Sequence, residues 1–345
     1  MTLRSATVLL LAALSCVFAG FAGWREAERE PPCTLALPAG GDLQKAVDGI
    51  ATNGPSATVC LGEGEFRLER FVAIDRDGVS LRGRGASTIL RLREGTASPV
   101  IVAGDYAHAT PQREIANVTI ENLRIVGGGA GGSEFQTGHP YLTNSAIVVR
   151  AGRQIAIRHV DVTACRSACI LTEQESRDVA IEGNEISGSV WDGISLNRTT
   201  RARLVGNTIR TNTAAGITTE HLEDSLIEDN VVIGNGTHGI YLSDSYGNRI
   251  DRNRFSKNVI SGVFVTCAVH DRDPVLCWSD SMSGDNVFEK NALIGNRVAY
   301  MVGADDAANC SKPTFTANLS RGDLFLQNPN ETPEAAAYGR CMRYL

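Results

Sequence analysis

The chain has 345 residues, a formal net charge of −6 and 21 % charged residues, which excludes a coiled coil and a disordered polyampholyte. Glycine makes up 35 of the residues and aromatic residues only 6 %, so many turns and short strands are expected. Because the balance is mildly acidic and there is no dense basic run, nucleic acid is not an expected partner.

Residues 1–23 have the features of an export signal. Arg4 supplies a positive charge, residues 8–14 form an uninterrupted apolar run, and small residues precede position 24, as signal peptidase requires. We therefore expect a bacterial protein of the periplasm or the cell exterior. Retention of this segment as a short anchor, or lipidation at Cys16, are the alternatives. No other stretch approaches the roughly 18 apolar residues of a membrane span.

The cysteines agree with an oxidising compartment. Without Cys16 their number is eight, which is even, and we expect structural disulfides. Neighbours in the sequence suggest the pairs Cys33–Cys60, Cys165–Cys169, Cys267–Cys277 and Cys310–Cys341. Eight cysteines allow 105 pairings, so the connectivity stays open. A metal site is the rival interpretation, but there is no Cys-x-x-Cys pair and the six histidines are scattered, so no metal is expected here.

Residues 42–51 have the pattern of a short amphipathic helix, and residues 57–64 and 78–85 read as short strands that end at glycine. Strand structures with an open end expose unpaired backbone groups there. We expect the helix to cover such an end.

The middle of the chain repeats every 23 residues. Asn184, Asn207, Asn230 and Asn253 are spaced by this period, and Asn291 follows after one period and a 15-residue insertion. Glycine-apolar pairs keep the same phase, from Gly193-Ile194 to Gly262-Val263. Each period holds two or three short runs of alternating apolar residues and no Leu-x-x-Leu-x-Leu pattern, which predicts a coil of stacked strands and not a leucine-rich repeat. We expect the asparagines to form a ladder at one turn, in the left-handed conformation that asparagine tolerates.

Over residues 38–303 this pattern resembles the right-handed parallel β-helix repeats of the pectate-lyase-like superfamily. The resemblance implies an all-β fold, a single-stranded right-handed parallel β-helix (a solenoid) with a short N-terminal capping helix. We expect one domain over residues 24–345, with coils at 38–303 and a C-terminal cap at 304–345.

Candidate functional residues follow from the alternation along each strand, because the positions two and four beyond the repeat glycine should face outward. The densest outward cluster spans three coils, and two residues before the glycines adjoin it. Proton removal next to a sugar carboxylate needs a group that neutralises the carboxylate, a base and an acid. We expect catalytic roles for Arg198, His221, Tyr241 and Glu220, and substrate-binding roles for Asn197, Asp192, His238 and Asp244. The alternative is a solvated face whose ion pairs contribute little.

Residues 192–198 and 238–244 resemble coils of the periplasmic mannuronan C5-epimerases, and the resemblance implies that Arg198 is catalytic. The Asp-Pro-His-Asp motif of that family is absent, and the nearest substitute is Gly138-His139-Pro140-Tyr141, two coils earlier. Asp192-Gly193 and His238-Gly239 also resemble polygalacturonase-type hydrolases, but alanines 214 and 215 replace the paired aspartates. Glu220 lies five residues along the strand from the Asp192 column, roughly 16 Å, so a hydrolase with this pair of carboxylates is not expected.

Two loops stand outside the repeat. Residues 127–132 contain five glycines and lead into residues 133–142. With no lysine and no following helix they do not form a P-loop, and we expect a mobile loop that overhangs the groove. The second loop, Cys267–Asp285, carries four aspartates, and calcium is the cofactor that they suggest, although the spacing matches no EF-hand. These aspartates are Asp271, Asp273, Asp280 and Asp285.

These observations predict an exported carbohydrate-active protein, a monomer, that acts on an acidic polysaccharide by β-elimination or C5-epimerisation of uronic acid residues. A non-catalytic carbohydrate-binding or cell-envelope scaffold protein is the main alternative. An accessory factor for periplasmic metal-centre assembly is the third.

Overall fold

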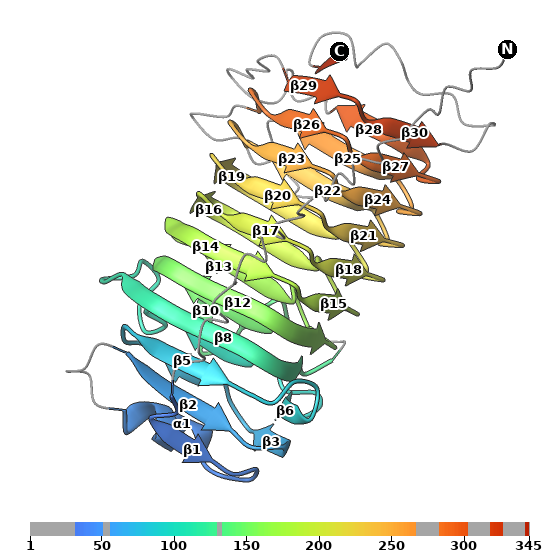
Figure 1. Ribbon diagram of the computed structural model, residues 1–345. Helices are drawn as coiled ribbons and strands as arrows, with labels where there is room; N and C mark the ends of the chain where they lie inside the picture. The colour runs from blue at the N-terminus through green and yellow to red at the C-terminus, as the bar shows by residue number, and fades with distance from the viewer. Residues whose placement is uncertain are drawn as a thin grey trace, which may run out of the picture. The chain divides into compact units, whose positions relative to one another are not determined.

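The computed structural model describes residues 32–50, 56–129, 133–266, 283–302, 318–326 and 342–344. Apart from Pro32, these residues belong to one compact unit, Cys33–Leu345. Within it, 29 strands join in one continuous sheet that winds through successive coils (Figure 1). The expected export segment at residues 1–23 and the pairs Cys267–Cys277 and Cys310–Cys341 lie outside the described residues.

The strands form three stacks, and in each stack a strand pairs in parallel with the strand of the next coil. Stack A comprises β4 (Val72–Ile74), β7 (Ile101–Ala103), β11 (Ile147–Arg150), β13 (Ile170–Glu173), β16 (Ile194–Thr200), β19 (Ile217–Glu223), β22 (His238–Ser243), β25 (Ser261–Thr266) and β28 (Val298–Val302).

Stack B comprises β1 (Leu35–Leu37), β2 (Ala57–Leu61), β5 (Val79–Arg82), β8 (Ile115–Val126), β12 (Gly152–Thr163), β14 (Ser176–Glu182), β17 (Arg203–Val205), β20 (Leu226–Glu228), β23 (Arg249–Asp251), β26 (Val287–Glu289), β29 (Asn318–Arg321) and β31 (Met342–Tyr344). Stack C comprises β3 (Gly64–Leu68), β6 (Thr88–Leu92), the C-terminal parts of β8 and β12, β15 (Glu185–Ser187), β18 (Thr208–Arg210), β21 (Val231–Ile233), β24 (Arg254–Ser256), β27 (Ala292–Ile294) and β30 (Leu324–Leu326).

This arrangement confirms the predicted right-handed parallel β-helix. A separate antiparallel hairpin, β9 (Phe135–Gln136) with β10 (His139–Thr143), stands beside stack A. Strands β29, β30 and β31 continue stacks B and C. These strands belong to residues 304–345, which we expected to form a C-terminal cap, so the described part of that segment adds strands to the coils.

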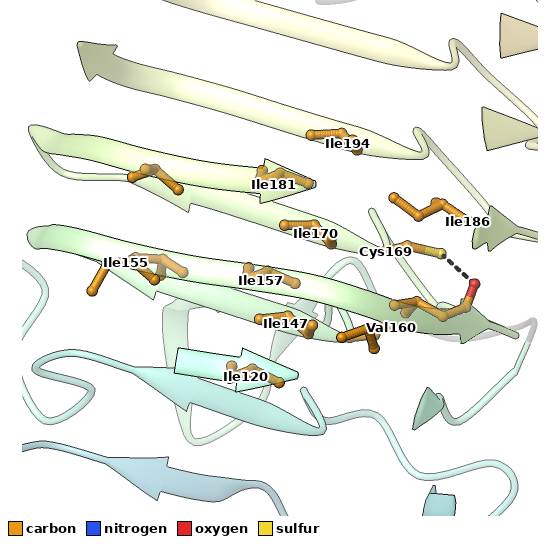
Figure 2. Close-up of a cluster of buried hydrophobic side chains, with 14 of the residues drawn as sticks. Ile120, Ile147, Ile155, Ile157, Val160, Cys169, Ile170, Ile181, Ile186 and Ile194 are labelled. Atoms are coloured by element: carbon orange, nitrogen blue, oxygen red, sulfur yellow. Dashed lines mark hydrogen bonds between the residues drawn. The ribbon is translucent and has the colours of Figure 1, made fainter. Parts of the chain in front are cut away.

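The interior between the stacks is filled with aliphatic side chains. Figure 2 shows Ile147, Ile170 and Ile194 of stack A facing Ile157 and Ile181 of stack B across this interior. All five are fully buried. Burial of an aliphatic side chain contributes roughly 1.5–3 kcal/mol, so the columns of isoleucine, leucine and valine are the main source of stability.

The predicted asparagine ladder is present between stacks B and C. Each side-chain amide donates to Oδ1 of the asparagine in the next coil, at 2.9 Å from Asn184 to Asn207 and again from Asn207 to Asn230. The same amide nitrogen donates to a backbone carbonyl of the preceding coil, as Asn207 does to Ile181 at 2.8 Å. Buried amides are therefore paired on both sides, as burial in a core requires.

One expectation about this ladder is wrong. The left-handed conformation belongs to the residue before each asparagine, for example Asp229 with φ 54° and Arg252 with φ 52°, and the ladder asparagines themselves are not left-handed. The asparagine is needed for its amide, because its side chain bonds both neighbouring coils, and the preceding residue makes the turn.

Two further ladders occupy the other corners. Asn212, Asn235, Asn258 and Asn296 are linked at 2.9–3.0 Å between stacks C and A, and Asn248 donates to Asn286 at 2.9 Å between stacks A and B. The Asn258–Asn296 and Asn248–Asn286 links span 38 residues. The 15-residue insertion therefore leaves the register of the coils unchanged.

A helix covers the first coil, and an aspartate ends the described asparagine ladder after Asn291. Helix α1 (Leu43–Asp48) is capped by Asp42, which accepts from Lys45 N at 3.0 Å, and it buries Leu43, Ala46 and Val47 at the first coil. At the other end, Asp323 takes the place of the next ladder asparagine, since its Oδ1 accepts from the side chain of Asn291 at 3.1 Å. Its Oδ2 accepts from Tyr300 Oη and Ser320 Oγ at 2.6 Å each.

Two disulfides are formed among the described residues, Cys33–Cys60 and Cys165–Cys169. Both pairs agree with the pairs that neighbouring positions in the sequence suggested. The first links the residues before β1 to β2, and the second closes a loop that precedes β13. No helix in the described part of the chain has the length and apolar character to cross a bilayer.

Candidate functional site

A groove with a volume of about 490 Å³ lies along the outward face of stack A. Its floor comes from alternate residues of four neighbouring strands, and its wall from the hairpin region and two loops. The lining residues are Glu134, Phe135, Thr143, Ser145, Ser167, Leu171, Glu173, Trp191, Asp192, Asn197, Thr218, Glu220, Tyr241 and Ser243. Four of them are carboxylates, so the groove presents many hydrogen-bond acceptors.

The floor is built by the alternation that the sequence predicted. Leu171, Thr218 and Tyr241 stand two residues beyond the repeat position, and Glu173 and Glu220 stand four beyond it. The residues immediately before the first outward position, such as Ile170 and Ile217, face the core. The 23-residue period therefore places like positions of successive coils in columns that cross the groove.

The repeat glycine is what brings the strands to this spacing. A Cβ added at Gly216 lies 2.8 Å from the carbonyl oxygen of Gly239 and overlaps the side chain of Val232. No larger residue fits there without displacing the next coil. The glycine therefore fixes where β19 begins and, with it, where Thr218 and Glu220 stand.

Glu173 is held by a buried arginine. Arg150 Nε donates to Glu173 Oε1 at 2.7 Å, and the guanidinium also donates to the carbonyls of Asp105, His108 and Ala109 at 2.7–2.9 Å. The Arg150 side chain is fully buried and lies 5.1 Å from the ring centre of Tyr141. Burial raises the pKa of Glu173 above its ordinary value, although Arg150 acts in the opposite direction.

Two polar atoms of the floor have no hydrogen-bond partner among the described residues. They are Thr218 Oγ1 and Asn197 Oδ1. Thr218 is 92 % buried, because only 8 % of its surface is exposed. An unpaired buried polar atom costs about 1–3 kcal/mol, which is recovered when a ligand or a water molecule supplies the missing partner.

Trp191 and Asp192 form the edge of the groove before β16. Asp192 Oδ1 accepts from Ala215 N at 3.0 Å and its Oδ2 accepts from Ser195 Oγ at 3.2 Å. These bonds hold the turn in place, while 43 % of the Trp191 surface is exposed. Trp191 thus offers an aromatic face next to polar groups.

The hairpin wall is tied to the same groove. Asn144 N donates to the carbonyl of Glu134 at 2.7 Å, and its side chain donates to the carbonyl of Ser133 at 2.9 Å. His139 Nδ1 contacts Tyr141 Oη at 3.0 Å. His139 and Tyr141 therefore bond each other, and only Glu134, Phe135 and Thr143 of this region line the groove.

The structure divides the eight candidate residues into three groups. Asp192, Asn197, Glu220 and Tyr241 line the groove. Arg198 lies beside it, in a second hollow of about 170 Å³ that it shares with Glu173, Gln174, Asn197 and Glu220. Arg198 has a φ of 43° and its side chain pairs with Glu175 at 3.5 Å.

His221, His238 and Asp244 do not line the groove among the described residues. His221 is 5 % exposed and Asp244 is fully buried, where it accepts from Ser243 Oγ at 3.1 Å. His238 Nδ1 lies 2.7 Å from Ser261 Oγ, and burial lowers the pKa of His238 to about 4. His221 and Asp244 have positive φ values, so the alternation along the strand stops at this corner.

Trp191, Glu134 and Arg150 were not singled out from the sequence. The strand alternation predicts that Glu173 faces outward, and β11 places Arg150 in register with it. Nothing in the neighbouring sequence predicts that the arginine is buried and pairs with Glu173. Glu134 comes from a loop outside the repeat. Of the four aspartates considered for calcium, Asp271, Asp273 and Asp280 lie outside the described residues.

The family model described as "Periplasmic copper-binding protein (NosD)" matches residues 129–323, more than half of the chain. The chain belongs to the NosD family. This match covers the 23-residue repeat and every strand that floors the groove. The two disulfides of this NosD-family protein, together with a family described as periplasmic, indicate an exported protein.

Comparison with solved structures shows the same fold in proteins of low identity. The A-module of mannuronan C-5 epimerase AlgE6 from Azotobacter vinelandii has 16 % identity and a TM-score of 0.50, covering 88 % of this chain and 92 % of that one. An alginate lyase from Paenibacillus sp. has 12 % identity and a TM-score of 0.60, covering 86 % and 95 %. PfbA, a surface adhesin of Streptococcus pneumoniae, has 12 % identity and a TM-score of 0.51, covering 85 % and 90 %. No curated protein matches the sequence significantly.

Proposed function

We propose that this NosD-family protein is an exported polysaccharide-binding β-helix protein whose groove holds part of a sugar chain and acts on it. The observation that carries the proposal is the groove itself, with an exposed Trp191 at its edge and carboxylate, amide and hydroxyl groups in columns along its floor. Carboxylates accept hydrogen bonds from hydroxyl groups, and a flat aromatic face provides apolar area next to polar groups.

The open form of the groove suits a polymer. The floor residues come from β13, β16, β19 and β22, whose parallel spacing of about 4.8 Å spreads them over roughly 14 Å. Equivalent positions, with different side chains, recur at each step, so that an extended ligand contacts several coils at once. Two of the similar structures are named as an epimerase of mannuronan and a lyase of alginate, and these names support a polysaccharide partner.

The charge of the described lining favours a neutral or sparsely charged sugar over the acidic polysaccharide expected from the sequence. Besides Glu173, which Arg150 pairs, the carboxylates Glu134, Asp192 and Glu220 line the groove, and a negative sugar held there would meet them at close range, where like charges repel. Arg198, the expected partner of a sugar carboxylate, lies in the adjoining hollow.

Action on uronic acid residues is a second candidate function, and the adjoining hollow favours it. There Arg198, Asn197 and Glu220 lie together, which supplies a cation, an amide and a base for β-elimination or C5-epimerisation. The Arg198 side chain is 44 % exposed and its pair with Glu175 is of the surface type that contributes at most about 1 kcal/mol. A sugar carboxylate is able to displace such a partner.

Copper does not fit the described residues. They include no group of three or more His, Cys, Asp or Glu side chains placed to hold a metal ion, and the four described cysteines are consumed in disulfides. Copper binding needs thiolate, thioether or imidazole ligands in a defined geometry. We therefore derive no step of the function through copper, and calcium at the 267–285 insertion stays a prediction.

Affinity electrophoresis of the full chain in gels that contain single polysaccharides tests the proposed function. The panel includes neutral xylan, glucan and galactan together with polygalacturonate and alginate. We expect retardation by at least one polymer, and Trp191→Ala to weaken binding at least tenfold, because an aromatic contact at a binding surface is often worth more than 1 kcal/mol. Val259→Ala, which removes an apolar side chain that is 61 % exposed outside the groove, should bind as the parent does.

Two results contradict the proposal. The first is that no polymer of the panel retards the protein. The second is that Trp191→Ala binds with unchanged affinity. The second candidate function predicts a uronate-specific signal, which is an unsaturated product or solvent deuterium in the sugar. We expect Arg198→Ala to abolish this signal, and turnover that survives the change excludes this second function.

A further inference from the structure

Glu173 and Glu220 stand in one column of the groove floor. The register pairs Thr172 with Leu196, so that Glu173 lies next to Asn197, and Asn197 pairs with Glu220. The two glutamates are therefore two coils apart, with one amide between them. Both line the main groove and both line the adjoining hollow.

The spacing of parallel strands converts this register into a distance. Two steps of about 4.8 Å give roughly 9.5 Å between the two backbones, and side chains of one column point the same way. Enzymes that hydrolyse glycosidic bonds with inversion have carboxyl groups about 6.5–9.5 Å apart, whereas retaining enzymes have them about 5–5.5 Å apart. The backbone separation of Glu173 and Glu220 lies at the upper limit of the inverting range and well above the retaining range.

We propose that this groove hydrolyses glycosidic bonds with inversion, with Glu173 as the general acid and Glu220 as the general base. The proposal rests on the proposed function, because it requires a sugar chain in the groove. From the sequence we did not expect a hydrolase, because the only carboxylate pair considered there was Glu220 with the Asp192 column. The pair that the structure supplies lies in the same column.

The surroundings of Glu173 fit an acid. Burial raises the pKa of Glu173 above its ordinary value while Arg150 acts in the opposite direction, and a raised pKa is the direction that a general acid requires. Arg150 fixes Oε1 at 2.7 Å and thereby the position of the carboxyl group. Glu220 is only half-buried, so water reaches its side of the column.

A separate observation points to a ligand at this place. Thr218 lies on the same strand as Glu220, lines the groove and is 92 % buried, and its Oγ1 has no partner among the described residues. Asn197 Oδ1, directly between the two glutamates, is in the same situation. Sugar hydroxyl groups donate and accept hydrogen bonds and so supply what both atoms lack.

The reaction balances with water as the only co-reactant. Glu173 gives its proton to the glycosidic oxygen while the bond from that oxygen to the anomeric carbon breaks. Glu220 takes a proton from a water molecule, whose oxygen forms the new bond to the anomeric carbon on the opposite face. Glu173 is then ionised and Glu220 protonated, and proton exchange with solvent restores both.

The experiment incubates the full chain with the polymer that it binds best and measures new reducing ends, with the anomeric configuration of the first product read by NMR. We expect inverted product. Glu173→Gln and Glu220→Gln should each lower turnover about 10²- to 10⁴-fold, the range of general acid or base catalysis, with binding retained in affinity electrophoresis. Glu185→Gln, at an exposed glutamate of stack C, is the matched control and should keep full turnover.

Chemical rescue separates the two roles. A sugar with an activated leaving group should restore turnover to Glu173→Gln, because departure then needs no acid. Added azide should restore turnover to Glu220→Gln by replacing the water, which needs the base. Polymer binding without new reducing ends overturns this inference and leaves the proposed function intact. Retained configuration, an unsaturated product, or full turnover in Glu173→Gln also overturns it, whereas absence of binding refutes the proposed function itself.

Discussion

Replacing Arg150 by methionine removes the one cation that Glu173 contacts within the buried base of the groove. Methionine keeps most of the apolar stem but none of the four donated bonds, of which one goes to Glu173 and three go to backbone carbonyls. Removal of one partner of a buried ion pair costs about 3–5 kcal/mol. We expect Arg150→Met to lower the free energy of unfolding by that amount.

A double-mutant cycle identifies how much of this loss belongs to the pair. Glu173→Gln leaves the three bonds from Arg150 to carbonyls intact, so its own cost should be smaller, about 1–3 kcal/mol. In the double variant methionine no longer faces a buried carboxyl group, and the coupling energy should lie at about 1–3 kcal/mol. Urea unfolding followed by circular dichroism, with the disulfides oxidised, measures each corner of the cycle.

The control for this cycle is Arg210→Ala, at an exposed arginine of β18, which should change stability by no more than about 0.5 kcal/mol. A loss below about 1 kcal/mol for Arg150→Met, or a coupling energy near zero, refutes the account. Either result means that the buried guanidinium does not hold Glu173 in place.

Three further predictions concern the coils and their pH dependence. Asn207→Ala should cost about 3–5 kcal/mol, because it deletes the bonds to Asn184, Ile181 and Asn230 and leaves buried polar groups unpaired; a loss under 1 kcal/mol in urea unfolding contradicts this. Gly216→Ala should cost more than about 2 kcal/mol, since its Cβ meets the next coil, and unchanged stability would show that the coils separate easily. Burial lowers the pKa of His238 to about 4, whereas the pKa of this histidine in the unfolded chain is 6.5. The free energy of unfolding should therefore fall by roughly 3 kcal/mol as the pH drops from above 6.5 to 4. His238→Gln should flatten that part of the stability profile, and an identical slope in this variant refutes the lowered pKa.

The coil geometry was open to prediction because it depends on short-range rules that repeat. Each period contains Asn230 or its equivalent, a Gly216 equivalent and alternating apolar residues, and each repeat supports the interpretation of the others. The ladder of Asn212, Asn235 and Asn258 carries the same 23-residue spacing and was equally available. This second ladder needs no signal beyond the spacing that predicts the first.

The site was harder to predict because only its floor follows the repeat period, whereas its wall and the burial of Arg150 depend on loops outside the repeat. Arg150, Glu173 and the loop at residues 105–109 meet only once the coils are stacked, and burial of a charged side chain has no sequence signature. His221 was assigned to the outer surface by extending the alternation of its strand. Its φ of 59° ends that alternation, and only the structure shows that the side chain is buried.

The asparagine ladder between stacks B and C has a direction, and Asp323 ends it. Every asparagine side chain in this ladder donates to the asparagine of the following coil, so each coil must supply an acceptor for the one before it. The carboxyl group of Asp323 accepts this hydrogen bond and, unlike an asparagine amide, has no N–H group with which to continue the ladder. The series of side-chain hydrogen bonds therefore stops at Asp323. Among the described residues, the direction of this ladder therefore requires an acceptor after Asn291, and Asp323 supplies it.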